Sequence, residues 1–114
     1  MGVGDASNPT HQYDQGIHVH ANGTGAVLHL TDGSSGSGTG DGFDIISHAS
    51  TAYLWQRENA NMVFGTQGVS RWNIYGSNGH FAPSADNTYD IGTTSVRVRT
   101  VSYTHLTLPT KNEV

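Results

Sequence analysis

The clearest candidate for metal chemistry in this sequence is a pair of histidines two residues apart, His18-Val19-His20. Alternate residues of a β-strand share a face, so the two imidazoles should lie about 6 to 7 Å apart. Two ligands from one chain rarely hold a transition metal. Three parallel chains would bring six nitrogens to a common axis, enough for an octahedral ion. The alternative to a metal site, and the commoner arrangement, is a pair of exposed or cross-strand histidines on a polar sheet face.

Four large aromatic residues form the second group with a recognisable binding chemistry. Tyr53 and Trp55 alternate along one predicted strand and therefore share a face, and Trp72 and Tyr75 follow in a later strand. Aromatic side chains on an exposed face suit contact with a sugar or a protein receptor. Because the chain holds so few apolar residues, we expect most of these four to lie in the core instead.

Carboxylates and hydroxyls are plentiful, but their spacing matches no catalytic pattern. The glycines form no GxSxG, GxGxxG or P-loop, and "GSGTGD" misses a calcium-binding repeat because Thr39 stands where its last glycine should be. Two acidic pairs bracket predicted turns, where Asp side chains bond the local backbone. They are Asp41 with Asp44 and Asp86 with Asp90. We therefore expect no enzyme; a depolymerase fragment would need these carboxylates clustered in a groove.

The composition predicts one domain at most, with a thin core. Of 114 residues, 34% are hydrophobic and 12% charged, against about 25% charged in an average soluble domain. Cysteine is absent, so metal binding or association with other chains has to supply the missing stability. Five basic residues against nine acidic ones argue against nucleic-acid binding. No apolar run is long enough for membrane insertion, and the first residues carry no basic or apolar leader.

Short alternating segments between glycines predict an all-β fold made of short strands and hairpins. No segment repeats apolar residues at helical spacing over three turns. Asn-Gly and Asp-Gly pairs at 22–23, 32–33, 41–42 and 78–79 are expected to form tight hairpin turns. Gly/Ser-rich residues 33–40 are expected to form a flexible surface loop, and residues 1–15 to be loosely ordered. The predicted strands are 16–21, 26–31, 42–47, 52–57, 61–65, 70–76 and 96–101.

The run "GHFAPSADNTYDIGTTSVRVRTV", residues 79–101, resembles a motif near the C-terminal end of phage tail fibre and tail spike proteins. That motif leads through a proline into Asp-Asn-Thr-Tyr-Asp-Leu/Ile-Gly, a few Ser or Thr residues, and an arginine-containing strand. Segments within 41–79 resemble the strands that usually precede it. The resemblance implies a trimeric, β-rich shaft or tip, often followed by an intramolecular chaperone domain. The His-x-His pair is also similar to metal-binding elements in some trimeric fibres.

In such an assembly Val96, Val98 and Val101 would pack between chains, while Arg97 and Arg99 would face solvent or pair with Asp86 or Asp90 of a neighbour. The sequence departs from the family's pattern in two places. Val98 stands where the strand usually carries a large residue such as Trp. Residues 102–114 differ in composition from the rest and resemble translated adapter read-through at the ends of metagenomic gene fragments, so we expect a non-native or truncated tail after the β-rich module of residues 16–101.

These observations predict a structural segment of a phage tail fibre that recognises the host. The expected partners are two further copies of the chain, in a homotrimer, and a bacterial surface receptor or glycan. The expected location is the virion tail, after synthesis in the host cytoplasm. The alternative is a monomeric β-sandwich module that binds carbohydrate through Tyr53, Trp55 or Trp72. Coplanar exposed aromatics would favour that alternative.

Overall fold

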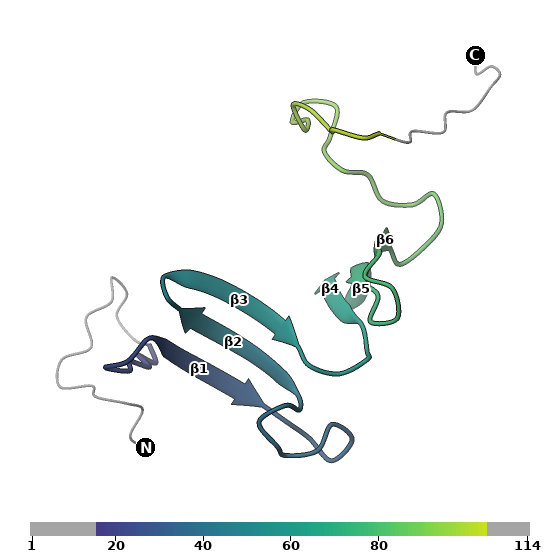
Figure 1. Ribbon diagram of the computed structural model, residues 1–114. Coiled ribbons are helices and arrows are strands. Elements are labelled where there is room, and N and C mark those ends of the chain that lie inside the picture. Colours follow the sequence, from purple (N-terminus) through teal and green to yellow (C-terminus); the bar gives the residue numbers. More distant parts are fainter. Residues whose placement is uncertain (1–15, 105–114) are drawn as a thin grey trace. The chain divides into compact units, whose positions relative to one another are not determined.

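Two small antiparallel sheets make up the regular structure of this protein. The computed structural model describes residues 16–104, and that part of the chain contains six strands and no helix. The all-β prediction is thus confirmed. The chain forms two compact units that divide between Ser84 and Ala85. The strands are β1 (Gly25–Leu30), β2 (Phe43–His48), β3 (Thr51–Gln56), β4 (Met62–Thr66), β5 (Val69–Ile74) and β6 (Phe81–Pro83), and Figure 1 shows their order.

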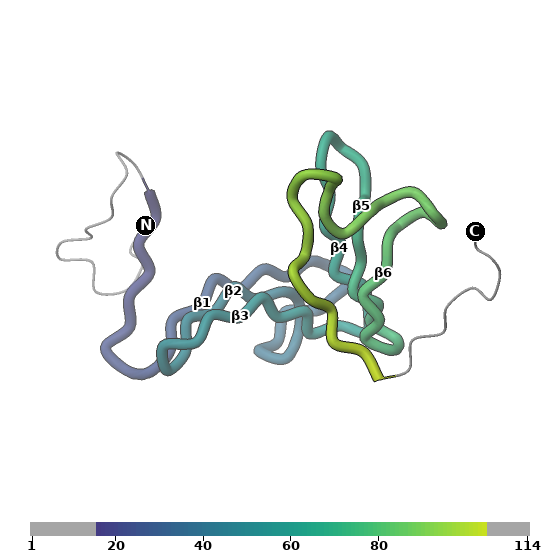
Figure 2. The backbone as a smooth tube through the Cα atoms, turned by 90° about the horizontal axis from the view of Figure 1, so that it is seen from above, coloured from purple at the N-terminus to yellow at the C-terminus, as the bar shows by residue number. Residues whose placement is uncertain are grey.

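The first sheet consists of β1, β2 and β3 in that order, with β2 in the centre (Figures 1 and 2). Its register sets His29 opposite Asp44, and Asp44 opposite Trp55. Since side chains alternate between faces, two faces of different chemistry result. The apolar face carries Leu28, Leu30, Phe43, Ile45 and Leu54. The mixed face carries Val27, His29, Asp44, Ile46, Tyr53 and Trp55.

The second sheet pairs β5 with β4 on one side and β6 on the other. Its aromatic side chains contact one another: the Trp72 ring stacks on Phe81 with centroids 5.0 Å apart, and Phe64 meets the edge of Phe81 at 6.3 Å. A β-bulge between Phe64 and Gly65 shifts the register of the β4–β5 pair. Asn73 is nearly buried and donates a hydrogen bond to the Ser84 hydroxyl.

Five of the seven predicted strands form within two residues of their expected ends, and two predictions were wrong. Residues 16–21 make no strand, and only His20 in that segment forms an isolated bridge. Residues 96–101 form no strand either: the Thr93 hydroxyl accepts hydrogen bonds from the backbone N–H groups of Ser95 and Val96, which closes a turn instead. Strand β6 was not predicted. The expectations for residues 1–15 and for most of the 102–114 tail lie outside the described residues.

Of the predicted Asn-Gly and Asp-Gly turns, Asn78-Gly79 lies in the β5–β6 hairpin connection, with Gly79 at a φ of 75°, but the two-residue turns of the other hairpins lie elsewhere. The β2–β3 turn is Ala49-Ser50, with φ of 48° and 69°, and the β4–β5 turn is Gln67-Gly68, with φ of 56° and 71°. Positive φ at both central positions defines the turn type that matches the twist of a hairpin. Strand register, rather than local turn preference, therefore decided where the first hairpin turns, because Ala and Ser do not favour these angles.

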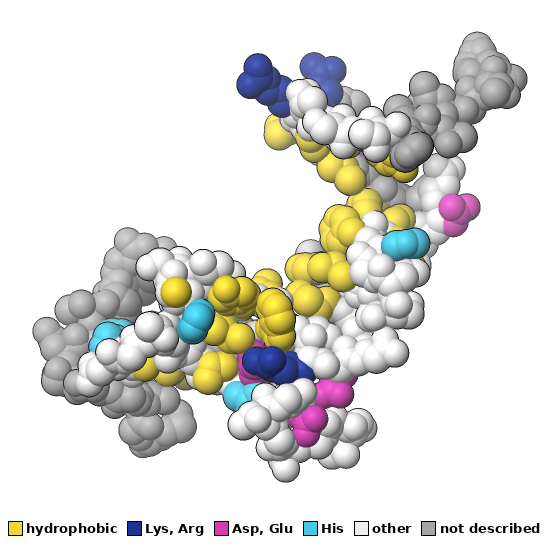
Figure 3. Space-filling view, in the orientation of Figure 1, with side chains coloured by type: hydrophobic (Ala, Val, Ile, Leu, Met, Phe, Trp, Pro, Cys, Tyr) yellow, Lys and Arg dark blue, Asp and Glu magenta, His cyan; other side chains and the backbone are white. Residues whose placement is uncertain are grey.

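The first unit lacks a conventional hydrophobic core. No hydrophobic side chain among residues 16–104 is buried, and the least exposed side chains are polar, with Asp44 only 2% exposed. Hydrophobic side chains lie open at the surface over the first sheet (Figure 3). The prediction that most of the large aromatics are core is therefore wrong for the single chain.

The strained Ala49-Ser50 turn yields a stability prediction. The double substitution A49N/S50G should stabilise the protein by about 0.5–1 kcal/mol, because Asn and Gly accept positive φ with little strain. The shift in a urea unfolding midpoint measures it. The single substitution S47G is the matched control, since it adds glycine within β2 and should lower the midpoint. A double variant no more stable than the parent would contradict the turn assignment.

Candidate functional site

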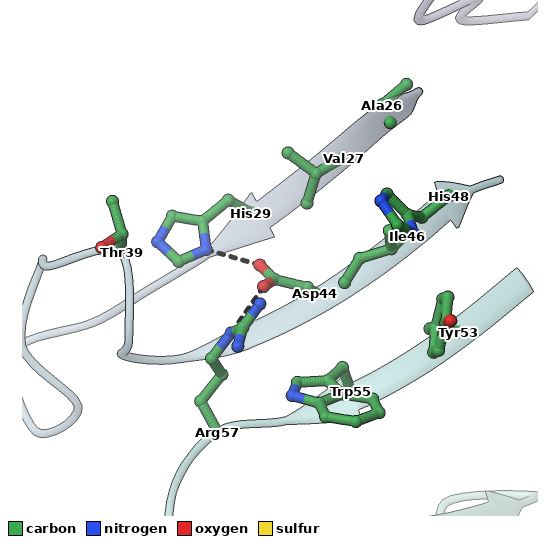
Figure 4. Close-up of a pocket in the computed structure, with 11 residues that line it drawn as sticks. Ala26, Val27, His29, Thr39, Asp44, Ile46, His48, Tyr53, Trp55 and Arg57 are labelled. Carbon is green, nitrogen blue, oxygen red and sulfur yellow. Dashed lines mark hydrogen bonds and ion pairs between the residues drawn. The ribbon is translucent and has the colours of Figure 1, made fainter. Parts of the chain in front are cut away.

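The most buried side chain of the described protein is a carboxylate held between two basic groups. Asp44 is the second residue of β2, and its Oδ1 lies 2.5 Å from Nδ1 of His29 on β1. Its Oδ2 accepts a hydrogen bond of 2.8 Å from Nε of Arg57, just after β3. Figure 4 shows the three side chains converging on one face of the sheet. Each carboxylate oxygen thus has a charged or polar partner, as a buried ionised group requires.

Both ring nitrogens of His29 face oxygen atoms, and this decides its protonation. While Nδ1 meets the Asp44 carboxylate, Nε2 lies 3.2 Å from the carbonyl oxygen of Gly38. Arg57 on the other oxygen of Asp44 favours the ionised carboxylate, so neither oxygen that faces the ring has a proton to donate, and the doubly protonated imidazolium is the form that satisfies both contacts. The hydrogen bond to Asp44 raises the pKa of His29 above its ordinary value of 6.5, and the same bond, helped by Arg57, lowers the pKa of Asp44. The geometry therefore favours the ion pair over its neutral form.

The glycine-rich loop between β1 and β2 is organised by hydrogen bonds, in contrast to the flexible loop predicted from its composition. The Asp32 carboxylate accepts the N–H groups of Ser34 and Ser35, and the Asp41 carboxylate accepts the N–H of Gly38. The Gly38 carbonyl oxygen also contacts Nε2 of His29, and His29 contacts Asp44, so the loop is linked to the buried carboxylate. The prediction that the Asp41 side chain bonds the local backbone in a turn is confirmed.

Gly42 closes this loop onto the sheet. Its φ is +81°, and a Cβ there would collide with the carbonyl oxygen of Leu30, so only glycine fits. Its N–H donates to the Glu58 carboxylate, and its carbonyl accepts the N–H of Arg57. The chain segment that carries Arg57 is thereby fixed next to Asp44. The prediction that Asp44 brackets a turn is wrong, because Asp44 lies inside a strand.

A depression of about 580 Å³ covers the mixed face beside this cluster (Figure 4). Val27 and Ile46 lie across its middle, Tyr53 and Trp55 line the β3 side, and Thr39 comes from the loop. The volume lies within the range of small-molecule sites, which are mostly apolar with a few polar groups. The site therefore combines an apolar surface with a charged end.

The His29–Asp44 pair resembles part of a hydrolytic triad in its residue types but not in its contacts. In a triad the second ring nitrogen accepts the proton of a nucleophilic hydroxyl or thiol. Here Nε2 of His29 faces the Gly38 carbonyl, which has no proton to give. The observed arrangement holds a loop in place rather than activating a nucleophile.

The four aromatic candidates separate into two places. Tyr53 and Trp55 share the mixed face as expected, with ring centroids 5.5 Å apart, but their planes cross at 79°. They do not form a coplanar platform. Trp72 lies on the second sheet against Phe81, and the backbone of Tyr75 bonds His80 and Gly79 in the loop after β5. Trp72 and Phe81 are nearly coplanar, but they stack on each other within the second sheet.

His18 and His20 have the predicted separation without the predicted strand. Their ring centroids lie 6.1 Å apart, and Nδ1 of His18 is buried without a hydrogen-bond partner. An orphaned nitrogen of this kind fits a metal ligand, since a buried polar atom otherwise needs a partner. Within residues 16–104, however, no group of three or more potential ligands comes together. From the described residues, this pair offers a metal two ligands per chain.

The valines expected at a trimer contact lie in the second unit, outside any strand. Val96, Val98 and Val101 are all exposed in the single chain. Gly92 has a positive φ of 96°, and the Thr93 N–H donates to the Val96 carbonyl, so the segment folds into a turn rather than extending. The strand expected for these valines is thus absent, whereas packing between copies stays a prediction.

The His29–Asp44–Arg57 cluster was not predicted from the sequence. Its signal is nevertheless present: His29 and Asp44 each interrupt a run of apolar residues in a predicted strand. A charged residue inside an apolar strand needs a partner on the neighbouring strand. Register was required to identify that partner.

Comparisons of the chain with protein-family models, curated proteins and solved structures find no match. Within residues 16–104 there is no helix long and apolar enough to cross a membrane. The contacts described above, together with the sequence motif, are therefore the basis for a function.

The charged cluster predicts a pH dependence with a defined sign. The raised pKa of His29 adds stability below pH 6.5, and this is lost as pH rises through the pKa in the folded protein. The lowered pKa of Asp44 adds stability above pH 3.8, and this is lost as pH falls through its folded pKa. Both contributions are complete between these limits. NMR titration of the His29 ring should give a pKa above 6.5.

The substitution D44N is the control for this titration, because it keeps the shape of the side chain and removes its charge. The pKa of His29 should then fall, and the amide protons of residues 36–41 should exchange faster with solvent. A His29 ring that titrates at or below 6.5 in the parent protein would refute the ion pair.

Proposed function

We propose that this chain is a structural, host-recognition segment of a phage tail fibre that works as a homotrimer and carries no catalysis. One observation carries the proposal: no hydrophobic side chain among residues 16–104 is buried, while Leu28, Leu30, Ile45 and Leu54 are all exposed on one face of the first sheet. On that face Leu54 is 56% exposed, and Leu28 and Ile45 are about as open. A chain with such a face needs a permanent cover.

Other copies of the chain are the cover that best fits this face. Burying apolar surface contributes about 25 cal/mol per Å², and burial within a single chain is too small to offset the entropy of ordering it. The apolar face contains no charged residue, and permanent homo-oligomer interfaces are similarly apolar and poor in charge. We therefore place the apolar face between the copies.

The number of copies and the biological setting come from the tail-fibre-like motif at 79–101. Under this proposal Val96, Val98 and Val101 add contacts between chains in the second unit. The assembly belongs to the virion tail, is made in the host cytoplasm, and presents its open surfaces to a bacterial receptor or glycan. These assignments depend on the resemblance.

A monomeric β-sandwich that binds carbohydrate is the competing proposal. A sandwich requires the inner faces of two sheets to bury a shared apolar layer. No hydrophobic residue of the described chain is buried, so the shared layer is missing. This observation favours the fibre over the sandwich.

We also propose that His18 and His20 bind a transition metal on the axis of the trimer. The buried, unpartnered Nδ1 of His18 and the 6.1 Å spacing of the rings support it. Three copies would bring six imidazoles together, which is a ligand set suited to an octahedral first-row metal.

Light scattering of the full chain tests the assembly. We expect a mass of three chains, together with the circular dichroism spectrum of a β protein. The substitution L54E should shift the mass towards one chain, because it places a charge in the apolar face. The substitution T51E, on the same strand but on the mixed face, should leave the mass unchanged. A parent protein that is folded and monomeric would contradict the proposal.

Metal analysis tests the histidine site. The purified trimer should contain about one transition-metal ion per three chains, and the variant H18A/H20A should contain none. The double substitution H48A/H80A removes two histidines elsewhere and serves as the control. Equal metal content in both variants would show that the bound metal does not depend on the His-x-His pair.

A further inference from the structure

We propose that the mixed face of the first sheet binds a carboxylate-bearing sugar residue, with Arg57 at the carboxylate and Trp55 against the ring. This sugar site rests on the proposed function in one respect: in the trimer, other copies cover the apolar face and leave the mixed face open to a ligand.

The depression has two chemically different parts. Between β1 and β3 its surface is apolar, with Val27, Ile46 and the two aromatic rings of β3. At the loop end it is polar, with the cluster around Asp44 (Figure 4). A volume of about 580 Å³ has room for a compact ring with substituents.

Internal hydrogen bonds remove the acceptors from the polar end and leave donors. Both oxygens of Asp44 are occupied, and its side chain is 3% exposed, so it is not available to a ligand. Arg57 spends Nε–H on Asp44, its side chain is 30% exposed, and its terminal N–H groups make no hydrogen bond with the described residues. The indole N–H of Trp55 likewise makes no hydrogen bond within the described chain.

A donor-rich site selects a ligand that brings acceptors. Guanidinium forms its best-matched hydrogen bonds with the two oxygens of a carboxylate, and these charge-assisted bonds are stronger than neutral ones. His29, held as a cation by its two oxygen neighbours, balances Asp44, so Arg57 leaves the cluster with a net positive charge. The complementary ligand is therefore an anion.

The aromatic surface next to this charge favours a sugar ring as the carrier of the carboxylate. Trp55 is 46% exposed, and its edge-to-face contact with Tyr53 holds the ring in place. One face of a pyranose presents C–H groups that pack on an indole, while its hydroxyls can reach the hydroxyls of Tyr53 and Thr39. An acidic sugar residue satisfies both parts of the depression at once.

Two ligands that differ only in the carboxylate test the proposal: methyl β-D-glucuronide and methyl β-D-glucoside. The full-length protein is titrated with each, and the indole N–H signal of Trp55 is followed by NMR. The glucuronide should shift this signal saturably, with an affinity at least about tenfold above that of the glucoside, as expected for a charge-assisted pair. Equal affinities, or no saturable shift with the glucuronide, would overturn the proposal.

Variants of the two contact residues sharpen the test. The substitution R57Q should weaken glucuronide binding about tenfold or more and leave glucoside binding unchanged. Because R57Q also disturbs Asp44, R57K serves as a second variant that keeps the positive charge without the two parallel N–H donors of arginine. Its affinity for the glucuronide should lie between those of the parent protein and R57Q. W55L should weaken the binding of both ligands, which is then followed through the NMR signals of the ligands. R99Q, outside the depression, should change neither affinity. Unaltered binding in W55L would refute the site.

Light scattering of the same samples separates this proposal from the proposed function. A monomer that binds glucuronide at Trp55 would refute the trimer and retain the site. A trimer that does not bind it would refute the site and retain the assembly. A trimer whose Trp55 indole proton is protected from solvent exchange would place a second copy on the mixed face, which also overturns the sugar site.

Discussion

A carboxylate removed from water has to be paired, and the first sheet is arranged around one such group. Asp44 is less exposed than any hydrophobic side chain of the described protein. Its two oxygens connect β1 through His29 and the end of β3 through Arg57. Because removing one partner of a buried pair leaves an uncompensated charge, this contact penalises any other register of the three strands. The loop and the turn at Gly42 follow from the same arrangement, since both position groups around it.

The charged cluster also explains why the two faces of this sheet differ. Polar groups whose hydrogen bonds are satisfied internally can remain at an open surface, so the mixed face does not need a permanent cover. The apolar face carries no charged residue, and its Leu28, Leu30, Ile45 and Leu54 side chains are exposed in the single chain. A face without charge suits permanent contact between copies, while a face with fixed donors suits a reversible ligand. Assembly and recognition can thus use opposite sides of one thin sheet without competing.

Much of the fold was accessible from local patterns, and the failures have physical causes. Alternating segments such as 26–31 and 52–57 were recognised because strand periodicity is a local property. The segments 16–21 and 96–101 alternate equally well but pair with no strand among residues 16–104, and alternation without a partner does not make a strand. Turn preference missed the β2–β3 turn for a related reason, since cross-strand register overrode the local residue types at Ala49-Ser50.

The sequence by itself determined the strand-rich, core-poor character of this protein, because composition and periodicity depend on neighbouring residues alone. It also placed Tyr53 and Trp55 on one face, which strand geometry dictates. Only the tertiary structure decided that His29, Asp44 and Arg57 meet, and which oxygen each nitrogen faces. These residues are separated by 15 and 13 positions in the chain. Their contact depends on how two hairpin connections align three strands, and no local preference carries that information.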